Sequence, residues 1–212
     1  MKALFDAVRG ERLQEVTLLL KDGADPNSTE KGTHYQDTAL TLACKQGNVE
    51  IVRELLSKGA NPNRREGDSL SERTPLIIAA ASGRPDIVEA LLRAGANPEA
   101  RAGLLHAQEG GDDVGASRAL TYAAAGGHTE AVLLLVFAGA RIERVDLETA
   151  ITAGHADVVR VLLRAGANPR WSFRDGRTAL QTAETSPERS RVAVVELVRR
   201  FLAPPPSHPQ VP

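Results

Sequence analysis

The sequence predicts an all-α solenoid of six stacked helix–turn–helix repeats, because a turn, an apolar helix and an alanine-rich helix recur in it. The turn is the dipeptide Gly-Ala, which closes an apolar run five times, at Gly23, Gly59, Gly95, Gly139 and Gly166. The first four glycines lie 36, 36 and 44 residues apart, and the last gap is 27. This spacing is typical of one supersecondary unit copied along the chain, in which each copy buries its apolar face on the next.

An apolar pattern before each Gly-Ala predicts an outer helix of about nine residues. In the second copy the pattern consists of Ile51, Val52, Leu55 and Leu56. Positions i, i+1, i+4 and i+5 form one wide apolar stripe on a helix. A glycine-containing turn precedes each of these helices. Pro85 fits the first turn of the third one, where its missing N–H removes no hydrogen bond.

A shorter, alanine-rich inner helix is predicted before that turn. Thr38, Thr74 and Thr178 stand at the starts of three such helices. A threonine hydroxyl at this position accepts a hydrogen bond from a free backbone N–H of the first turn. Small residues such as Ala43 let the inner helices approach their neighbours closely. Cys44 lies in the same alanine row, so we expect it to be a buried small apolar residue.

The repeated unit resembles the ankyrin repeat. Residues 74–79 read Thr-Pro-Leu-Ile-Ile-Ala, which is similar to the family's Thr-Pro-Leu-His-x-Ala start, with Ile77 in place of the histidine. Residues 23–27 and 59–63 resemble the family's Gly-Ala-Asp-x-Asn entry into a projecting hairpin, called a finger. The resemblance covers about residues 2–202. It implies a protein that binds partners on a concave face formed by the fingers and the inner helices, with capping repeats at both ends.

The repeats predict a single domain over residues 1–202, followed by a disordered Pro-rich tail at 203–212. The first repeat begins directly at its inner helix, over residues 2–9. The fourth finger is cut back to residues 141–144, before a helix over 146–153, and the last helix spans 192–202. A glycine-containing insert at 100–117 is expected to be flexible. The expected repeats are at about 1–27, 28–63, 64–99, 100–143, 144–170 and 171–202.

Charge and cysteine content exclude several classes of protein. The chain has 26 basic and 27 acidic residues, so its global charge gives no argument for nucleic acid or membrane binding. The single cysteine cannot form an intramolecular disulfide or a cysteine-based zinc site. The N-terminus meets an acid at Asp6 and develops no secretory apolar region, and no apolar stretch reaches membrane-span length. We therefore expect a cytoplasmic monomer that needs no cofactor or metal and contacts no membrane.

No catalytic motif is present. The sequence has no Gly-x-Ser-x-Gly, His-x-x-Glu-His, Cys-x-x-Cys or phosphate-binding loop. His128 and His155 follow a turn glycine, where the resemblance implies that the ring packs and hydrogen-bonds across repeats. We expect a protein that is not an enzyme. The alternative is an enzyme with a composite site at the 100–117 insert. Its titratable residues would be His106, Glu109, Asp112 and Asp113.

The resemblance places partner contacts on the fingers and on the ends of the inner helices, and implies a partner protein rather than a small-molecule substrate. The function would be sequestration, inhibition or scaffolding, with an inhibitor or immunity-type protein as one form. An alternative is nucleic-acid binding through the Arg-rich fingers, although scattered acids interrupt the basic stripe that phosphate binding needs. The candidate contacts are His34, Tyr35, Asp37, Lys45, Gln46, Arg64, Arg65, Arg73, Leu104, Leu105, Arg141, Arg144, Trp171, Phe173, Arg174 and Arg177.

The last finger holds the only tryptophan of the chain, in the segment Arg-Trp-Ser-Phe-Arg-Asp-Gly-Arg at 170–177. Tryptophan and arginine dominate the hot spots of protein interfaces. The alternative is that Trp171 and Phe173 fold back to cover the edge left by the shortened fourth finger. The arginines of the C-terminal fingers predict a partner with an acidic patch, whereas the third finger is more acidic.

Overall fold

The computed structural model describes residues 2–30, 37–65, 73–102, 117–173, 175–185 and 188–203. These residues form twelve helices and contain no extended strand, only three isolated β-bridges. The structure divides into two compact units, Met1–Arg141 and Ile142–Pro212. The predicted all-α repeat fold is therefore confirmed. His34, Tyr35, Leu104, Leu105 and Arg174 lie outside the described residues, as do positions 103–116 of the insert and 204–212 of the tail.

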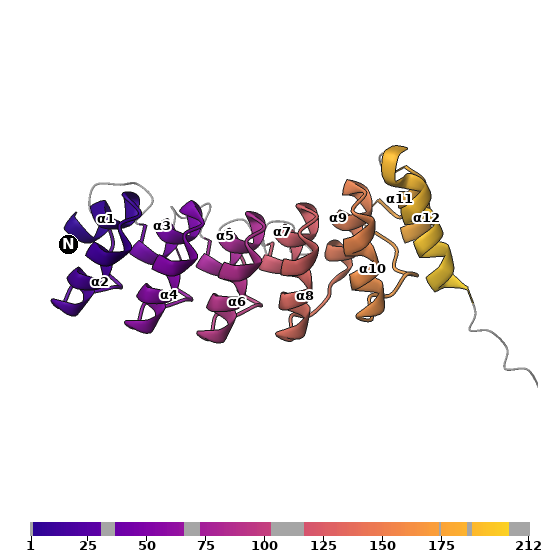
Figure 1. Ribbon diagram of the computed structural model, residues 1–212. Helices are drawn as coiled ribbons and strands as arrows, with labels where there is room; N and C mark the ends of the chain where they lie inside the picture. The colour runs from indigo at the N-terminus through magenta and orange to yellow at the C-terminus, as the bar shows by residue number, and fades with distance from the viewer. Residues whose placement is uncertain are drawn as a thin grey trace, which may run out of the picture. The chain divides into compact units, whose positions relative to one another are not determined.

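The first unit contains four helix pairs in two layers (Figure 1). Each inner helix packs against the outer helix that follows it, and neighbours within a layer also pack against each other. The inner layer consists of α1 (Lys2–Arg9), α3 (Ala39–Gln46), α5 (Pro75–Ala81) and α7 (Ala119–Ala125). The outer layer consists of α2 (Leu13–Lys21), α4 (Val49–Ser57), α6 (Pro85–Arg93) and α8 (Thr129–Phe137).

The second unit contains α9 (Arg144–Ala153), α10 (Ala156–Arg164), α11 (Ala179–Glu184) and α12 (Glu188–Leu202). Helix α9 packs against α10 and α11, and α12 packs against α10 and α11. Helix α9 begins two residues before the predicted start because Glu143 and Asp146 form a capping box, in which the Glu143 N–H donates to Asp146 Oδ2 at 2.8 Å. Helix α12 begins at Glu188, four residues before the predicted start at Val192. The apolar pattern could not reveal this start, because the first turn of the helix is charged.

The five outer helices that precede a Gly-Ala turn each span nine residues, as the apolar pattern predicts. They end there because the glycine adopts a positive φ, which is 90° at Gly23 and 101° at Gly166. After α2, the Gly23 N–H donates to Leu20 O and the Ala24 N–H to Leu19 O. These two bonds form a Schellman motif, which ends a helix and redirects the chain.

Threonine caps start three of the inner helices. Thr38 accepts from the Thr41 N–H at 3.1 Å, and Thr74 and Thr178 accept in the same way at 3.3 Å. These bonds confirm the predicted caps. Arg118 holds the equivalent place before α7 and makes no capping bond with its side chain. The start of α7 therefore departs from the repeat pattern.

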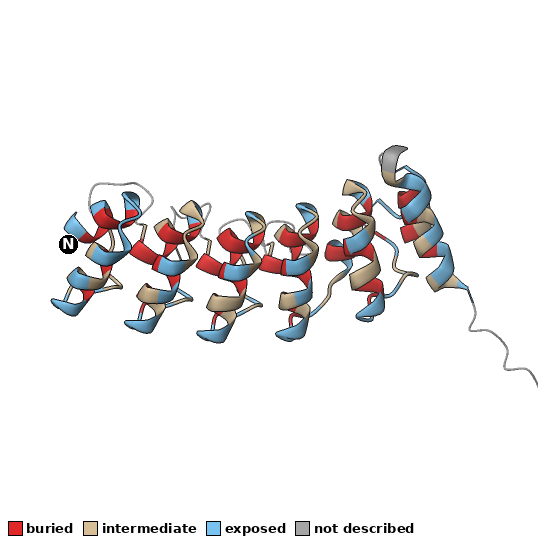
Figure 2. Cartoon of the chain, in the orientation of Figure 1, coloured by how far each residue is buried: buried red, intermediate tan, exposed pale blue. Residues whose placement is uncertain are grey.

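The apolar core of each unit lies between its two helix layers (Figure 2). Leu40, Ile51 and Leu55 are among the fully buried residues, and Cys44 is buried as predicted. Burial of these facing stripes is the main force that holds the repeats together. Among the described helices, none combines the length and apolar character that crossing a membrane requires.

His128 connects the third and fourth repeats. Its Nε2 lies 3.2 Å from the Ala81 carbonyl oxygen, and its ring fills the space beside two glycines. A Cβ atom added at Gly83 or Gly126 would lie 2.4 or 2.3 Å from a ring nitrogen of His128. The expected packing and hydrogen bonding of His128 across repeats is therefore confirmed.

Candidate partner-binding surface

The four Asp-Pro and Asn-Pro segments share one local turn at the start of the finger. Asp25 Oδ1 accepts a hydrogen bond from the Asn27 N–H at 2.8 Å. Asn61, Asn97 and Asn168 each accept in the same way from the residue two positions later, at 2.9 Å. Asparagine and aspartate side chains stabilise such turns by mimicking a backbone acceptor. The direction in which each finger leaves its outer helix is thereby fixed.

The first two fingers are also bonded to the repeat that follows them. Asn27 Nδ2 donates to the Gly59 carbonyl oxygen at 2.9 Å, and Asn27 Oδ1 accepts from the Asn61 N–H at 2.7 Å. Asn63 makes both bonds one repeat further on, at 3.0 and 2.7 Å. One carboxamide supplies both the donor and the acceptor. These paired bonds hold the bases of successive fingers in register.

The third finger replaces this asparagine with Glu99. Glu99 Oε1 accepts from the Arg141 N–H at 2.8 Å, and Glu99 Oε2 accepts from Arg118 Nη1 at 2.9 Å. Arg118 Nη1 also donates to the Arg141 carbonyl oxygen at 2.8 Å. The Arg118 side chain is only 1% exposed, whereas that of Glu99 is 42% exposed. Two charged side chains therefore replace the single asparagine. They bond the N–H and the carbonyl oxygen of Arg141, whereas Asn27 bonds the Asn61 N–H and the Gly59 carbonyl oxygen.

The first finger brings together several of the predicted contact residues. Lys45 at the end of α3 is exposed and lies 3.1 Å from the Asp37 carboxylate. Gln46 Nε2 donates to the Arg9 carbonyl oxygen at 3.0 Å. Arg9 in turn hydrogen-bonds Glu30, and this bond raises the pKa of Arg9. The polar groups at this inner-helix end are therefore bonded to the finger and to the preceding repeat.

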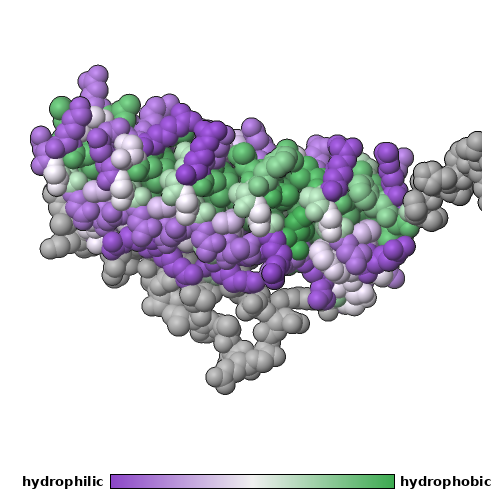
Figure 3. Space-filling view, turned by 90° about the horizontal axis from the view of Figure 1, so that it is seen from below, coloured by the Kyte–Doolittle hydropathy of each residue, from purple (hydrophilic) through white to green (hydrophobic). Residues whose placement is uncertain are grey.

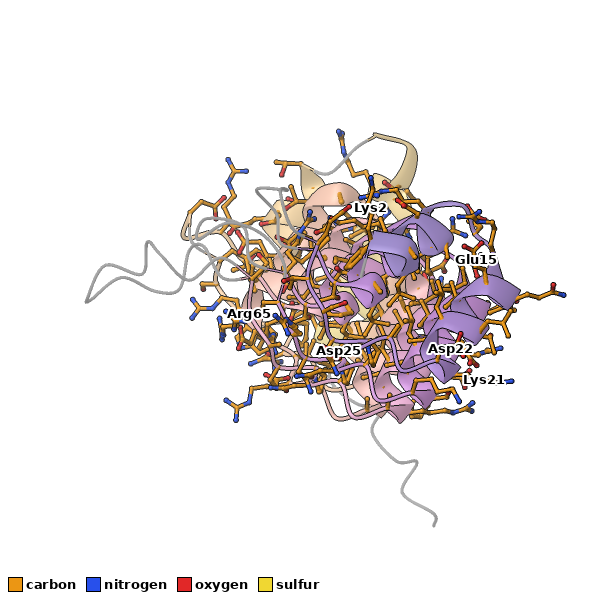
Figure 4. All side chains as sticks on the ribbon, turned by 90° about the vertical axis from the view of Figure 1, so that its left-hand side faces the viewer. Lys2, Glu15, Lys21, Asp22, Asp25 and Arg65 are labelled. Carbon is orange, nitrogen blue, oxygen red and sulfur yellow. The ribbon has the colours of Figure 1, made fainter. Side chains whose placement is uncertain are left out.

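The second finger carries three predicted arginines. Arg64 is exposed, and its Nη1 donates to the Asn27 carbonyl oxygen at 2.9 Å. Arg65 and Arg73 are half-buried, and Nε of Arg73 has no hydrogen-bond partner within the described part of the chain. Figure 4 shows Arg65 on the opposite side of this unit from Lys21 at the end of α2. The second finger therefore lies on the face of the unit that is opposite to the end of α2.

An open hollow of about 470 Å³ lies between the second and third fingers. Two arginines, Arg65 and Arg101, and one carboxylate, Glu99, line it together with neutral residues. The described residues include no group of three or more His, Cys, Asp or Glu side chains that could hold a metal ion.

The last finger is a short hairpin in the second unit. An isolated bridge joins Ser172 to Thr178, and the Phe173 N–H donates to the Arg177 carbonyl oxygen at 2.8 Å. Arg144 Nη1 donates to the Ser172 carbonyl oxygen at 3.0 Å. The backbone of the hairpin is therefore bonded both internally and to the start of α9.

The two aromatic residues of this hairpin differ in burial. Phe173 is only 3% exposed, whereas Trp171 is half-buried. Arg144 and Arg177 are exposed, and Arg177 lies 3.4 Å from the Asp175 carboxylate. From the sequence, Trp171 and Phe173 had the same two expected roles. In the structure, Phe173 lies inside the unit, whereas Trp171 lies at its surface.

One outer helix has an unusual surface. Leu133 and Phe137 of α8 are 38% and 86% exposed. The same positions of α6 hold Glu89 and Arg93, which form an ion pair at 2.8 Å. Figure 3 shows apolar surface at the place that α8 occupies in Figure 1. Helix α8 is therefore apolar on its solvent side as well as on its core side.

Comparison with known proteins agrees with this architecture. Residues 2–102 match the family model for ankyrin repeats, which has three copies. A solved ankyrin repeat domain from Acinetobacter baumannii AYE is 26% identical with a TM-score of 0.77, covering 95% of this chain and 98% of that chain. A second solved ankyrin repeat protein, EF0377, is 23% identical with a TM-score of 0.74, covering 93% and 96%. No curated protein matches the sequence significantly.

The predicted resemblance to the ankyrin repeat family is therefore confirmed, by the family model over residues 2–102 and by solved ankyrin repeat structures over most of the chain. Ankyrin repeats generally act as modules for protein–protein interaction, and the family is typically non-catalytic. Stacked repeats bind partners over an extended surface that successive repeats build together.

Proposed function

We propose that this protein binds a partner protein through its finger segments and the adjoining ends of its inner helices. The binding itself would be the function, as sequestration, inhibition or scaffolding. The match of residues 2–102 to the ankyrin repeat family supports this proposal. So do exposed charged side chains, of which Lys45 lies at an inner-helix end and Arg64 and Arg177 lie on fingers.

The described starts of the fingers are held in place before any partner arrives. Side-chain turns fix their starts, and Asn27 and Asn63 bond the first two of them to the following repeat. A surface that is already ordered loses less conformational entropy on binding than a flexible loop does. This preorganisation favours a specific interface over a merely solvated loop surface.

The observation that carries the proposal is the different burial of the two aromatic residues in the last finger. Buried Phe173 anchors the hairpin, while Trp171 remains partly exposed in the same hairpin as the exposed Arg170 and Arg177. A large aromatic ring next to guanidinium groups can bury apolar area and donate several hydrogen bonds to one partner. We leave Phe173 out of the proposed contact surface because its ring is buried.

The charge of this hairpin favours a partner with acidic groups. Arg170 and Arg177 of the hairpin are exposed, as is Arg144 at the start of α9. Asp175 is the only acidic residue in the sequence of segment 170–177. Exposed charges of one sign accelerate association with an oppositely charged partner, and salt weakens the effect. The proposed contact is therefore an acidic patch with an apolar residue that packs on Trp171.

Affinity capture from native lysate tests the proposal. The wild-type protein is compared with a W171A/R177A variant and with a control variant, R164A/V192A, which changes exposed residues of α10 and α12. The proposal predicts that one protein is captured by the wild type and by the control but not by W171A/R177A. Equal capture by the wild type and both variants would contradict the proposal, as would capture of nucleic acid alone.

A further inference from the structure

The start of α7 lacks a threonine cap that three other inner helices have. Helices α3, α5 and α11 begin with a threonine whose hydroxyl accepts a backbone N–H. Arg118 stands at this place before α7; it makes no such bond, and its side chain is only 1% exposed. Loss of a cap and burial of a charge both lower stability. Natural proteins keep such local violations mainly where function requires them.

A second exchange accompanies the first at the other end of the third finger. Glu99 stands where the two preceding fingers have Asn27 and Asn63. Its carboxylate accepts from Arg118 at 2.9 Å, so the two unusual residues are direct partners. Because Glu99 without Arg118 would lose this cation, and the buried Arg118 without Glu99 would lose a carboxylate 2.9 Å away, the exchanges are interdependent.

Together the two side chains hold the backbone of Arg141 at both of its polar groups. Glu99 accepts from the Arg141 N–H, and Arg118 donates to the Arg141 carbonyl oxygen. Arg141 stands at the position of Asn61 and Asn97, two residues after the glycine of the turn. Those asparagines accept from their own finger backbones, whereas the Arg141 side chain is exposed.

We propose that Glu99 and Arg118 are a positioning pair that fixes Arg141, at the shortened fourth finger, as a contact for a carboxylate of the partner. Only the contact made by Arg141 rests on the proposed binding function. The positioning follows from the three hydrogen bonds. A guanidinium on a fixed backbone loses less freedom when it binds a carboxylate, and it can donate two parallel bonds.

Hydrogen exchange of the Arg141 amide tests the positioning. The variants are E99N, R118T and the double variant E99N/R118T, which recreates the Asn63–Thr74 arrangement of the preceding repeat. Each single variant should exchange at least about tenfold faster than the wild type, because it removes one side of the bonds around the Arg141 backbone and takes from the remaining charged residue the partner that it bonds here. The double variant should return to within about threefold of the wild type, because an asparagine can accept from the same N–H.

The Asn61 amide is the internal control, because Asn27 accepts its hydrogen bond and none of these variants changes that repeat. Its exchange should stay the same in all four proteins. Exchange of the Arg141 amide that is unchanged in both single variants would overturn the positioning pair. So would a double variant that exchanges as fast as the faster single variant, because the two residues would then act independently.

Binding of a fluorescent oligoglutamate peptide at low salt tests the contact. R141A should weaken binding at least about threefold without changing the exchange of its own amide, since its backbone bonds remain. R118T should weaken binding, and E99N/R118T should restore it, whereas K58A, on an exposed residue after α4, should have no effect. Equal binding by the wild type and R141A would overturn the contact, and with it this part of the proposed function, while the exchange result would still decide the positioning.

Discussion

Asn63 Oδ1 accepts a hydrogen bond from the backbone N–H of Asn97 at 2.7 Å, which joins the second finger directly to the third. The other end of the same carboxamide donates to the Gly95 carbonyl oxygen at 3.0 Å. Asn27 makes the equivalent two bonds one repeat earlier. These bonds lie outside the apolar core, so they add a second, polar connection between repeats on the finger side.

The variant N63A should lower the free energy of unfolding by about 2 kcal/mol, because it removes two hydrogen bonds that contribute about 1 kcal/mol each. Urea unfolding followed by circular dichroism measures this change. K58A, on a nearby exposed residue, should stay within about 0.5 kcal/mol of the wild type. If N63A were as stable as K58A, the connection between the fingers would contribute nothing.

The variant T74A should lower the free energy of unfolding by about 1 kcal/mol, because the Ile77 N–H loses its capping acceptor. T74S keeps the hydroxyl and should recover most of the loss. Thermal unfolding of the three proteins gives the comparison. An equal loss in T74S and T74A would indicate that the methyl group of Thr74, rather than its hydroxyl, stabilises α5.

Gly126 and His128 should show strong coupling. Gly126 has φ of −81°, so an alanine there meets no backbone strain, but its Cβ would lie 2.3 Å from His128 Nε2. G126A should therefore lower the free energy of unfolding by about 1–3 kcal/mol in the wild type. In an H128A background the same change should be neutral or stabilising, because the ring is gone. A double-mutant cycle that is additive would contradict this packing.

The exposed face of α8 should tolerate charge. The variant L133E/F137R recreates the Glu89–Arg93 pair of α6, and an i, i+4 pair contributes a few tenths of a kcal/mol. Its free energy of unfolding should stay within about 0.5 kcal/mol of the wild type. A loss of more than about 2 kcal/mol would show that Phe137 is buried in the protein in solution.

The repeated parts of the fold could be predicted because each has a local physical cause. Five Gly-Ala turns require a positive φ, three threonines offer a hydroxyl to a free N–H, and the apolar spacing has a helical period. The boundaries that the sequence missed, at α9 and α12, are set by charged residues of the first turn rather than by apolar ones. Glu143 and Arg144 carry no apolar signal, although the Glu143–Asp146 spacing fits a capping box.

The candidate surface was less predictable because it depends on contacts between repeats. Burial of Phe173 but not of Trp171 is decided by tertiary packing, and alternation along a short hairpin does not determine it. The roles of Glu99 and Arg118 were missed, although a signal existed. Aligning the repeats places Glu99 under Asn27 and Asn63, and Arg118 under the capping threonines, and two such exchanges at the ends of one finger indicate a pair.

The most direct test of the account is a hydrogen-exchange footprint of the protein bound to its captured partner. Binding through the fingers predicts slower exchange in the last hairpin, residues 168–178, and at the finger starts that follow α4 and α6. It also predicts unchanged exchange in the outer helices α2, α4, α6, α8 and α10. Protection confined to the outer helices, with the fingers unchanged, would contradict the account.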